Sequence, residues 1–239
     1  MSVLTRAPES GVAWIELSDD ADNNGLSDNL IAGLVGALDT VGRDSETRAV
    51  VLAGTPRWFC SGATRDTLRA VQSHRRAPAE LTLARKLLDV PVPVIAAAEG
   101  DTLGGGLALL LAADLLVVAG QSRHAANFMK LGITPGMGIT HLLGAILGPA
   151  LARELLYTGR SIRGADLPTG AANAIVPRDR VRERASDLAW AIADHDRDNL
   201  RLLKRSLSLP ARRALEEAMT LESLMHESSL HRYDERQLG

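Results

Sequence analysis

Apolar runs and amphipathic stretches alternate along the first half of the chain, a pattern that predicts an α/β fold. Residues Val3–Arg6 and Val12–Leu17 alternate as strands do, and the turn-forming stretch Pro8–Gly11 between them predicts a hairpin. A helix is expected to start at Ser27 or Asp28 and to end near residue 42, followed by a buried strand over residues 48–53. Because strand, helix and strand follow one another, we expect the strands that flank this helix to pair in parallel.

The middle of the chain repeats the pattern around three consecutive glycines. Pro93–Ala98 is a short apolar run typical of a buried strand. Gly104, Gly105 and Gly106 then open an apolar helix over residues 107–116, and another strand is expected over residues 114–119. Glycines at a helix start let the backbone approach a ligand closely, and the free N–H groups of the first turn favour an oxyanion. Packing of the helix against the sheet is the alternative explanation for the triplet.

From residue 139 onward the sequence is predominantly helical. The expected helices cover Thr140–Leu147, Pro149–Thr158, Val181–His195, Asn199–Ser208 and Pro210–His231, with a short extended piece at Ala174–Pro177. Two earlier helices are expected over residues 66–73 and 81–89, on either side of a charged loop. We therefore divide the chain into a mixed core over residues 1–180 and a helical region over residues 181–239.

Composition and charge narrow the class of protein. A hydrophobic content of 46% over 239 residues is ample for the core of one domain. The net charge of −2 and the aromatic content of 3% give no electrostatic or stacking basis for a nucleic-acid or membrane partner. The single cysteine, Cys60, rules out an internal disulfide framework, and we expect a cytoplasmic protein with no signal peptide and no membrane span.

A second short motif lies between a strand and a helix. Ser61, Gly62 and Ala63 follow the strand at residues 48–53 and precede the helix expected at residue 66. Backbone N–H groups at such a junction are free to point at a ligand, although an ordinary strand-to-helix turn explains the motif as well. Cys60, just before the motif, is interpreted as a small buried hydrophobic residue rather than a nucleophile.

Several motifs, in this order, resemble those of the crotonase (enoyl-CoA hydratase/isomerase) superfamily. They are RAVVLAG followed by WFCSGA, PVIAAAEGDTLGGG, LGITPGMG and ELLYTGRSIRGADLPTGAANAIVP. The resemblance covers nearly the whole chain. It implies a crotonase-like spiral core of ββα repeats, with a C-terminal helical region that covers the active site and forms homotrimers, often paired into hexamers. It also implies an oxyanion hole made by the backbone N–H groups of Ala63 and Gly105, where one donor is worth roughly 3 kcal/mol in the transition state.

Hydratases of this superfamily carry two catalytic glutamates, and this sequence has neither. The residue two positions after the glycine triplet is Ala108, and the residue four positions before the glycine of LGITPG is Phe128. Adding water to a double bond needs one group to activate the water and another to protonate carbon. Since alanine and phenylalanine can do neither, hydration is not expected.

The segment AANFMKLGITPGMG and the C-terminal LMHESSLH resemble a narrower subgroup, the decarboxylating enoyl-thioester hydratase homologues of polyketide β-branching. Those enzymes decarboxylate a 3-methylglutaconyl group carried by an acyl carrier protein. Losing CO2 from such a group needs an oxyanion hole for the dienolate, an apolar pocket and a proton source. The resemblance therefore implies a lyase whose pocket is lined by Gly104, Ala108, Phe128, Gly136 and Met137.

The same subgroup implies a catalytic histidine on the last helix, which is His226 here, with His231 the weaker candidate. Its catalytic lysine has no counterpart, because the matching position falls near Val71. No metal or bound cofactor is implied, since the substrate arrives on the phosphopantetheine of an acyl carrier protein or on CoA. Arginines that we expect near the tunnel mouth, Arg65, Arg69, Arg75 and Arg76, are candidates for contact with an acidic carrier protein.

Two alternatives stay open from the sequence. One is a dehydratase, hydratase or double-bond isomerase acting on an acyl thioester, which needs an acid–base group that the motifs do not supply. The other is a non-catalytic protein that binds acyl thioesters or holds a multienzyme complex together. Loss of the mass of CO2 from an incubated substrate distinguishes the decarboxylase from both.

Overall fold

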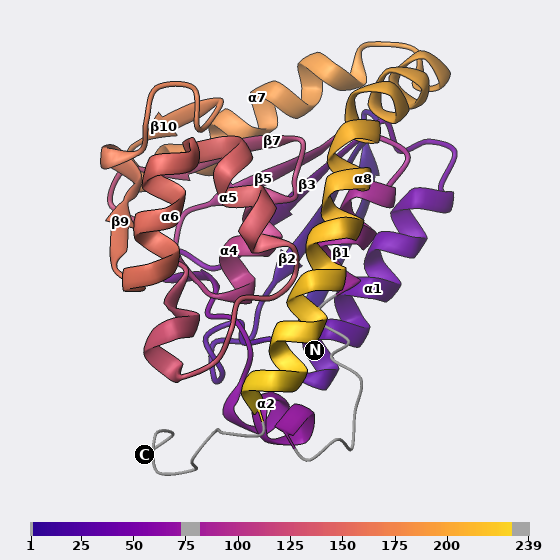
Figure 1. Cartoon of the computed structure of the whole chain (residues 1–239). Helices are drawn as coiled ribbons and strands as arrows, with labels where there is room; N and C mark the ends of the chain where they lie inside the picture. Colours follow the sequence, from indigo (N-terminus) through magenta and orange to yellow (C-terminus); the bar gives the residue numbers. More distant parts are fainter. Residues whose placement is uncertain (1, 73–81, 231–239) are drawn as a thin grey trace.

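A six-stranded sheet forms the centre of the molecule (Figure 1). The computed structural model describes residues 2–72 and 82–230. The order across the sheet is β1 (Val3–Glu9), β2 (Val12–Leu17), β3 (Ala49–Ala53), β5 (Val94–Ala98), β7 (Leu115–Ala119) and β10 (Ala174–Val176). The predicted hairpin is confirmed, since β1 and β2 pair antiparallel, and so is the parallel pairing of β2 with β3.

A second sheet of short strands lies beside the first, and the sequence pattern did not predict it. Its order is β4 (Trp58–Cys60), β6 (Asp101–Leu103), β8 (Arg123–Ala125) and β9 (Ser161–Arg163). Three-residue strands are too short to show an alternating pattern. The strands β4, β6 and β8 follow β3, β5 and β7 directly in the chain, so successive turns of the chain add one strand to each sheet. This repeat is the crotonase-like spiral that the resemblance implied.

Helices surround the two sheets. They are α1 (Asp28–Arg43), α2 (Arg65–Gln72), α3 (Leu83–Asp89), α4 (Gly105–Leu111), α5 (Ile139–Leu147), α6 (Pro149–Thr158), α7 (Val181–Ala193) and α8 (Arg197–Leu230), with 3₁₀ turns at Asn127–Leu131, Gly164–Asp166 and Arg178–Arg180. Ser27 is the cap of α1, because its hydroxyl oxygen accepts a hydrogen bond from the Leu30 N–H at 3.3 Å.

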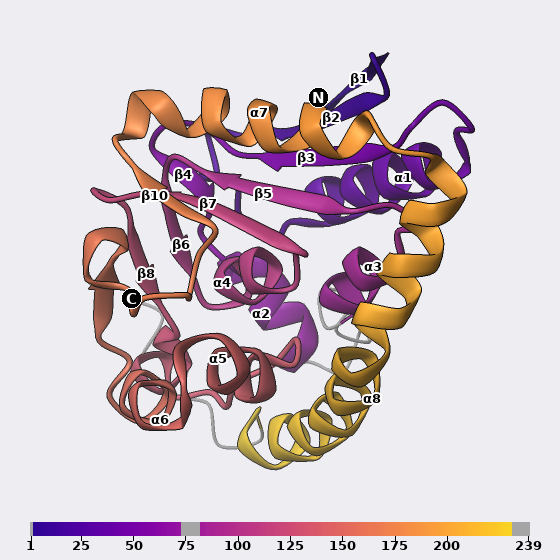
Figure 2. The ribbon, with the colours of Figure 1, turned by 90° about the horizontal axis from the view of Figure 1, so that it is seen from above.

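The central strands are buried on both faces, which explains their continuous apolar runs. In β3, Ala49, Val51 and Ala53 face α7, whereas Val50 and Leu52 face the larger core on the other side. Figure 2 shows α7 lying across one face of the large sheet, with α3, α4 and α8 on the opposite side. The sheet is thus the middle layer, and the glycine-rich helix α4 lies in the larger core.

Two predicted helix boundaries are wrong. The helix after the glycine triplet ends at Leu111, not at residue 116, because β7 must start at Leu115 to pair with Ile95 of β5. The turn between them is fixed by Asp114, whose carboxylate accepts a hydrogen bond from the Val94 N–H at 2.7 Å. The same carboxylate contacts the buried ammonium of Lys204 on α8 at 2.7 Å.

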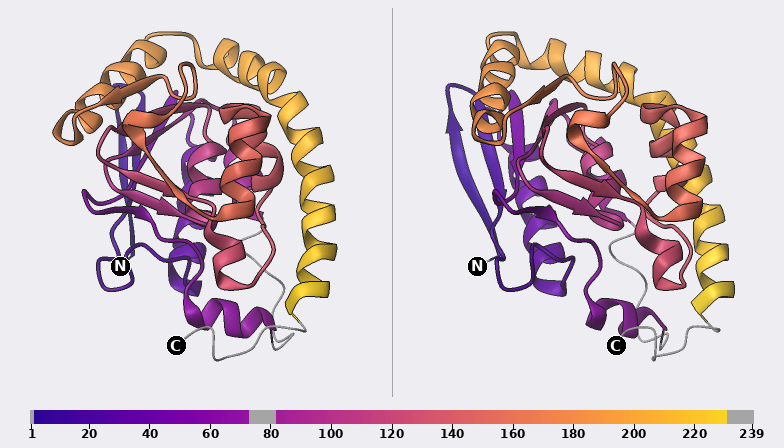
Figure 3. Two further views of the ribbon diagram at one scale, coloured as in Figure 1. Left: turned by 60° about the vertical axis from the view of Figure 1, so that its left-hand side comes forward. Right: turned by 90° about the vertical axis from the view of Figure 1, so that its left-hand side faces the viewer.

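The last two predicted helices are in fact one, because α8 continues through Pro210. Proline cannot donate the hydrogen bond to the carbonyl of residue 206, which costs a helix interior about 3 kcal/mol. Buried contacts of Lys204 and Ser208 on one side and Leu215 on the other hold both halves against the core. Figure 3 shows α8 running along the outside of the molecule.

Across the described ranges, no helix is both long and apolar enough to cross a membrane.

A buried histidine joins the small sheet to the end of β7. His124 of β8 is 2% exposed, with Nδ1 at 2.8 Å from the Thr102 hydroxyl and Nε2 at 3.0 Å from the Ser122 hydroxyl. Because the Ser122 hydroxyl donates to the Ala119 carbonyl at 2.7 Å, Nε2 is the protonated nitrogen and Nδ1 accepts from Thr102. Burial lowers the pKa of His124 to about 4, so the ring stays neutral in the folded protein.

Because His124 is buried in its neutral form, we expect the free energy of unfolding to fall in acid. Between pH 6.5 and 4 the unfolded chain takes up a proton at residue 124 that the folded chain excludes, so stability falls as the pH falls through this window. The contribution of this group is up to about 3 kcal/mol. Urea unfolding at pH 7.5 and pH 5 measures it, with His124→Gln as the non-titrating comparison. An equal acid loss in both proteins would contradict the assignment.

Candidate active site

The site is built where the first turn of α4 meets the end of β4. Gly104 has a φ of +50°, a conformation that favours glycine, and its N–H donates to the Ala125 carbonyl at 2.8 Å. A β-carbon on Gly106 would lie 2.1 Å from the carbonyl oxygen of Cys60. Only glycine at position 106 therefore lets α4 start this close to β4.

The Ser61–Ala63 turn lies directly against the start of α4. Gly62 has a φ of +83°, and a β-carbon on it would lie 2.6 Å from the Leu103 carbonyl and 3.3 Å from the Gly105 nitrogen. The Gly62 carbonyl accepts a hydrogen bond from the Leu26 N–H at 2.8 Å, which anchors the turn to the loop before α1. Two segments that are about forty residues apart in the chain are thus held in contact through their backbones.

Two backbone donors are available at this contact. In the described part of the chain, the N–H groups of Ala63 and Gly105 have no backbone or side-chain acceptor. Gly105 is the first residue of α4, and the first N–H groups of a helix have no partner within it. Both residues line the same cavity, which brings two backbone amides without a protein acceptor to one place.

The cavity has a volume of about 60 Å³ and is mostly apolar. Its walls come from the loop before α1, the two glycine turns, α2, the Asn127–Leu131 turn, the TPGMG loop and α8; the residues are Leu26, Ser61, Gly62, Ala63, Leu68, Gly104, Gly105, Asn127, Phe128, Leu131, Ile133, Gly136, Met137 and His226. Among the described residues, no aspartate or glutamate lines it. The arrangement can bind a carbonyl oxygen but offers no carboxylate to activate water.

The residues predicted to line the substrate pocket can be compared with the cavity wall. Of the five residues predicted for the substrate pocket, Gly104, Phe128, Gly136 and Met137 lie on the cavity wall, whereas Ala108 is fully buried within α4 and does not line it. Ala108 lies one turn into the helix, where it packs in the core. Sequence reasoning missed Leu26, Leu68, Ile133 and Asn127, of which Asn127 stands in the NFMK motif beside Phe128.

His226 reaches the cavity from the far end of α8. Burial lowers the pKa of its imidazole below the usual value. A bound anion beside the ring would favour the charged imidazolium and oppose this effect. The side chain is therefore placed to take up a proton when an anionic ligand binds.

Glu222, one turn before His226, attaches α8 to the TPGMG loop. Its carboxylate is 1% exposed and accepts hydrogen bonds from the N–H of Gly138 at 2.6 Å, the N–H of Thr140 at 3.0 Å and the Thr140 hydroxyl at 2.7 Å. Leu215 packs so closely beneath that a β-carbon on Gly138 would lie 1.9 Å from it. The helix that carries His226 is thereby fixed to the loop that carries Met137.

A polar groove opens beside the cavity and shares Ser61 with it. The groove has a volume of about 910 Å³ and is lined by residues of the loop before α1 and of α2, including Asp22, Ser27, Arg65 and Arg69. Both arginines are exposed on α2. Arg75, Arg76 and His231 lie outside the described residues, and Val71 lies on α2.

Cys60 takes no part in this chemistry. Its side chain is fully buried, and burial raises the pKa of the thiol to about 12. A thiol with such a pKa is not a nucleophile near neutral pH, which agrees with its interpretation as a small hydrophobic residue.

This chain belongs to the enoyl-CoA hydratase/isomerase family, whose sequence model matches residues 7–238. Bacillaene synthase decarboxylase PksI of Bacillus subtilis is 35% identical over 93% of this chain and 90% of its own length. A solved structure of a dehydratase/decarboxylase enzyme couple involved in polyketide β-branching covers 100% of this chain and 98% of its own, with a TM-score of 0.94 and 34% identity. The ECH2 decarboxylase domain of CurF from Lyngbya majuscula superposes over 99% of this chain and 97% of its own, with a TM-score of 0.89 and 31% identity.

Removing the Glu222 carboxylate is expected to loosen α8 from the cavity. Glu222→Ala leaves the N–H groups of Gly138 and Thr140 without their charged acceptor, which predicts a loss of about 3 kcal/mol in the free energy of unfolding. Glu217→Ala, at an exposed position of the same helix, is the matched control and is expected to change it by less than about 0.5 kcal/mol. Chemical unfolding measures both, and equal stability of the two variants would contradict the role given to Glu222.

Proposed function

We propose that this protein is a lyase that decarboxylates a 3-methylglutaconyl-type acyl thioester carried by an acyl carrier protein, as part of polyketide β-branching. The observation that carries the proposal is a small apolar cavity with two free backbone N–H groups and, among the described residues, no carboxylate in its wall. The similarity to PksI and to the CurF decarboxylase domain supports the same reaction class.

In the proposed reaction the thioester oxygen lies between the N–H groups of Ala63 and Gly105. The bond between the distal carboxylate carbon and its neighbouring CH2 carbon breaks, CO2 leaves, and the electron pair delocalises onto the thioester oxygen as a dienolate. The two N–H groups stabilise this oxyanion, and apolar neighbours such as Phe128 and Met137 favour loss of the charged carboxylate. One proton then returns to carbon and gives a 3-methylcrotonyl thioester.

His226 is the proposed source of that proton. It lines the cavity, and among the described lining residues it is the one side chain that titrates near neutral pH. The substrate carboxylate would raise the imidazole pKa from its lowered value in the free protein and so charge the ring on binding.

The polar groove beside the cavity is the proposed path of the phosphopantetheine arm. It shares Ser61 with the cavity, and Arg65 and Arg69 on its rim suit an acidic carrier protein.

We also propose that the protein forms a homotrimer, and that two trimers pair into a hexamer. Leu207, 71% exposed, and Leu221, 57% exposed, lie with Leu203 and Met225 along one side of α8, a stripe that water disfavours. With one buried thiol, Cys60, the proposed compartment is the reducing cytoplasm.

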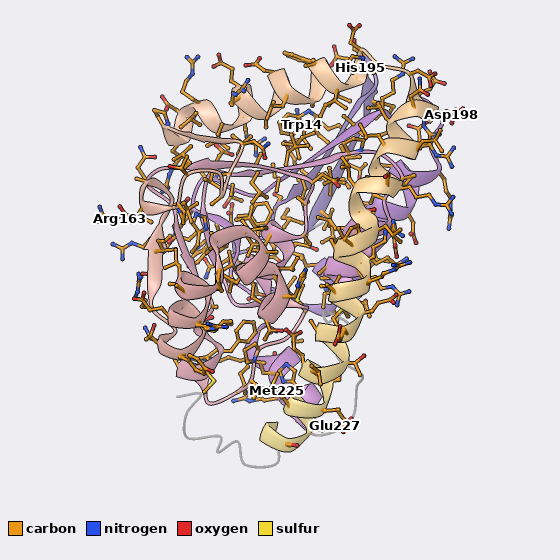
Figure 4. All side chains as sticks on the ribbon, turned by 45° about the horizontal axis from the view of Figure 1, so that its top comes forward. Trp14, Arg163, His195, Asp198, Met225 and Glu227 are labelled. Atoms are coloured by element: carbon orange, nitrogen blue, oxygen red, sulfur yellow. The ribbon has the colours of Figure 1, made fainter. Side chains whose placement is uncertain are left out.

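Replacement of His226 tests the chemistry. His226→Ala is expected to lower the rate of CO2 release from 3-methylglutaconyl-carrier protein by about a hundredfold or more, because a positioned proton donor is worth that much. The control is His195→Ala, an exposed residue in the turn between α7 and α8, far from Met225 near the other end of α8 (Figure 4). Unchanged CO2 release in His226→Ala would remove its role, and tight thioester binding without CO2 release by the unaltered protein would favour the non-catalytic alternative.

A further inference from the structure

One side-chain amide, that of Asn127, lies in the wall of the mostly apolar cavity. Asn127 is the first residue of the Asn127–Leu131 turn, between the buried end of β8 and Phe128. Its amide lies against the turn that leads into α4, because a β-carbon on Gly104 would lie 3.2 Å from the Asn127 Oδ1 atom. Gly104 immediately precedes Gly105, one of the two proposed oxyanion donors.

The amide of Asn127 is not used by the fold. In the ranges that the structure describes, it makes no hydrogen bond, and it does not cap its own turn. Asn127 is half-buried, and the fully buried Asn24 behaves differently, since its amide donates to the Leu17 carbonyl at 3.1 Å and the Trp58 carbonyl at 2.9 Å. An asparagine in a turn ordinarily bonds to nearby backbone. The two N–H donors of Asn127 are therefore available to a ligand.

The proposed substrate brings a group that needs such a donor. It carries a second carboxylate at the end of its acyl chain, and the described lining holds no lysine or arginine to receive it. The position of the subgroup's lysine falls near Val71, whose residue type cannot bind an anion. His226 supplies charge to this group in the proposed reaction, and the neutral amide of Asn127 adds a directed hydrogen bond that orients the carboxylate.

We propose that the Asn127 amide donates a hydrogen bond to the distal carboxylate of the acyl group and so selects diacid thioesters over neutral ones. The inference rests on the proposed function and names the residue that gives it specificity. Asn127 holds the carboxylate on the wall formed by the Asn127–Leu131 turn, and the carboxyl-bearing carbon stays close to the oxyanion site. His226 approaches from α8 and delivers the proton after CO2 has left.

Equilibrium binding of two saturated thioesters tests the inference without turnover. The probes are 3-methylglutaryl-pantetheine, which carries the distal carboxylate but lacks the double bond that decarboxylation needs, and isovaleryl-pantetheine, the same chain without the carboxyl group. Asn127→Leu keeps the shape and removes the donors, and Asn127→Asp keeps the shape and adds a negative charge. Asn199→Asp, an exposed change of the same charge, is the control.

The expected result is a loss that depends on the carboxylate. Affinity for 3-methylglutaryl-pantetheine should fall about 10- to 100-fold in Asn127→Leu and further in Asn127→Asp, because a hydrogen bond to a charged group is lost and then replaced by repulsion. Affinity for isovaleryl-pantetheine should change by less than about threefold in both. Equal losses for the two probes, or no loss for either, would overturn the inference. If Asn127→Leu fails to fold, the isosteric Asn127→Asp decides alone.

A CO2-release assay on the unaltered protein tests the proposed decarboxylation separately from the role of Asn127. A carboxylate-dependent loss of binding without CO2 release means that Asn127 selects diacids in a protein that does not decarboxylate them. CO2 release with equal binding losses means that the reaction is right and that Asn127 has only a structural role. Failure of the unaltered protein to bind either probe would overturn both.

Discussion

The contact between the Ser61–Ala63 turn and the first turn of α4 is the constraint on which the site depends. Gly62 and Gly106 leave no room for a side chain, because their missing β-carbons would overlap the backbone of Leu103 and Cys60. This close approach brings the N–H groups of Ala63 and Gly105 to one cavity without any hydrogen bond to satisfy them in the described chain. In the proposed reaction these two donors bind the oxyanion, and preorganised donors of this kind are the largest single contribution in many enzymes.

The remaining walls are attached to that contact from the C-terminal half of the chain. α8 passes along the outside of the core, fixed near its start by Lys204 and Asp114 and near its end by Glu222 and the TPGMG loop. Each attachment is a buried charged group with specific partners, so breaking one leaves an unsatisfied charge. His226 lies beyond the second attachment, which explains how a residue so late in the chain reaches the cavity.

Much of this arrangement could be predicted from the sequence, and the failures have physical causes. The long apolar strands and the cap at Ser27 gave clear signals because their patterns are local. The four strands of the small sheet gave none, since three residues do not define a period. Pro210 predicted a helix boundary, but contacts from distant residues outweighed its local cost.

In the site too, some residues could be identified from local sequence motifs and others only from their surroundings in space. The glycine motifs and the missing glutamates at Ala108 and Phe128 could be identified from spacing within known motifs. Asn127 and Glu222 could not, because their importance comes from what surrounds them in space: an amide without a partner in the described chain and a carboxylate that meets two backbone amides. Ala108, by contrast, is fully buried in the core cluster and does not line the cavity, which its spacing from the glycine triplet could not indicate.

In the proposed reaction, two backbone amides polarise the thioester carbonyl. Infrared difference spectroscopy of 3-methylcrotonyl-pantetheine labelled with ¹³C at the thioester carbonyl, free and bound, measures this polarisation directly. We expect the carbonyl stretch to shift to lower frequency on binding, because hydrogen bonds from Ala63 and Gly105 weaken the C=O bond. A bound carbonyl with the same stretching frequency as the free thioester in an apolar solvent would contradict it.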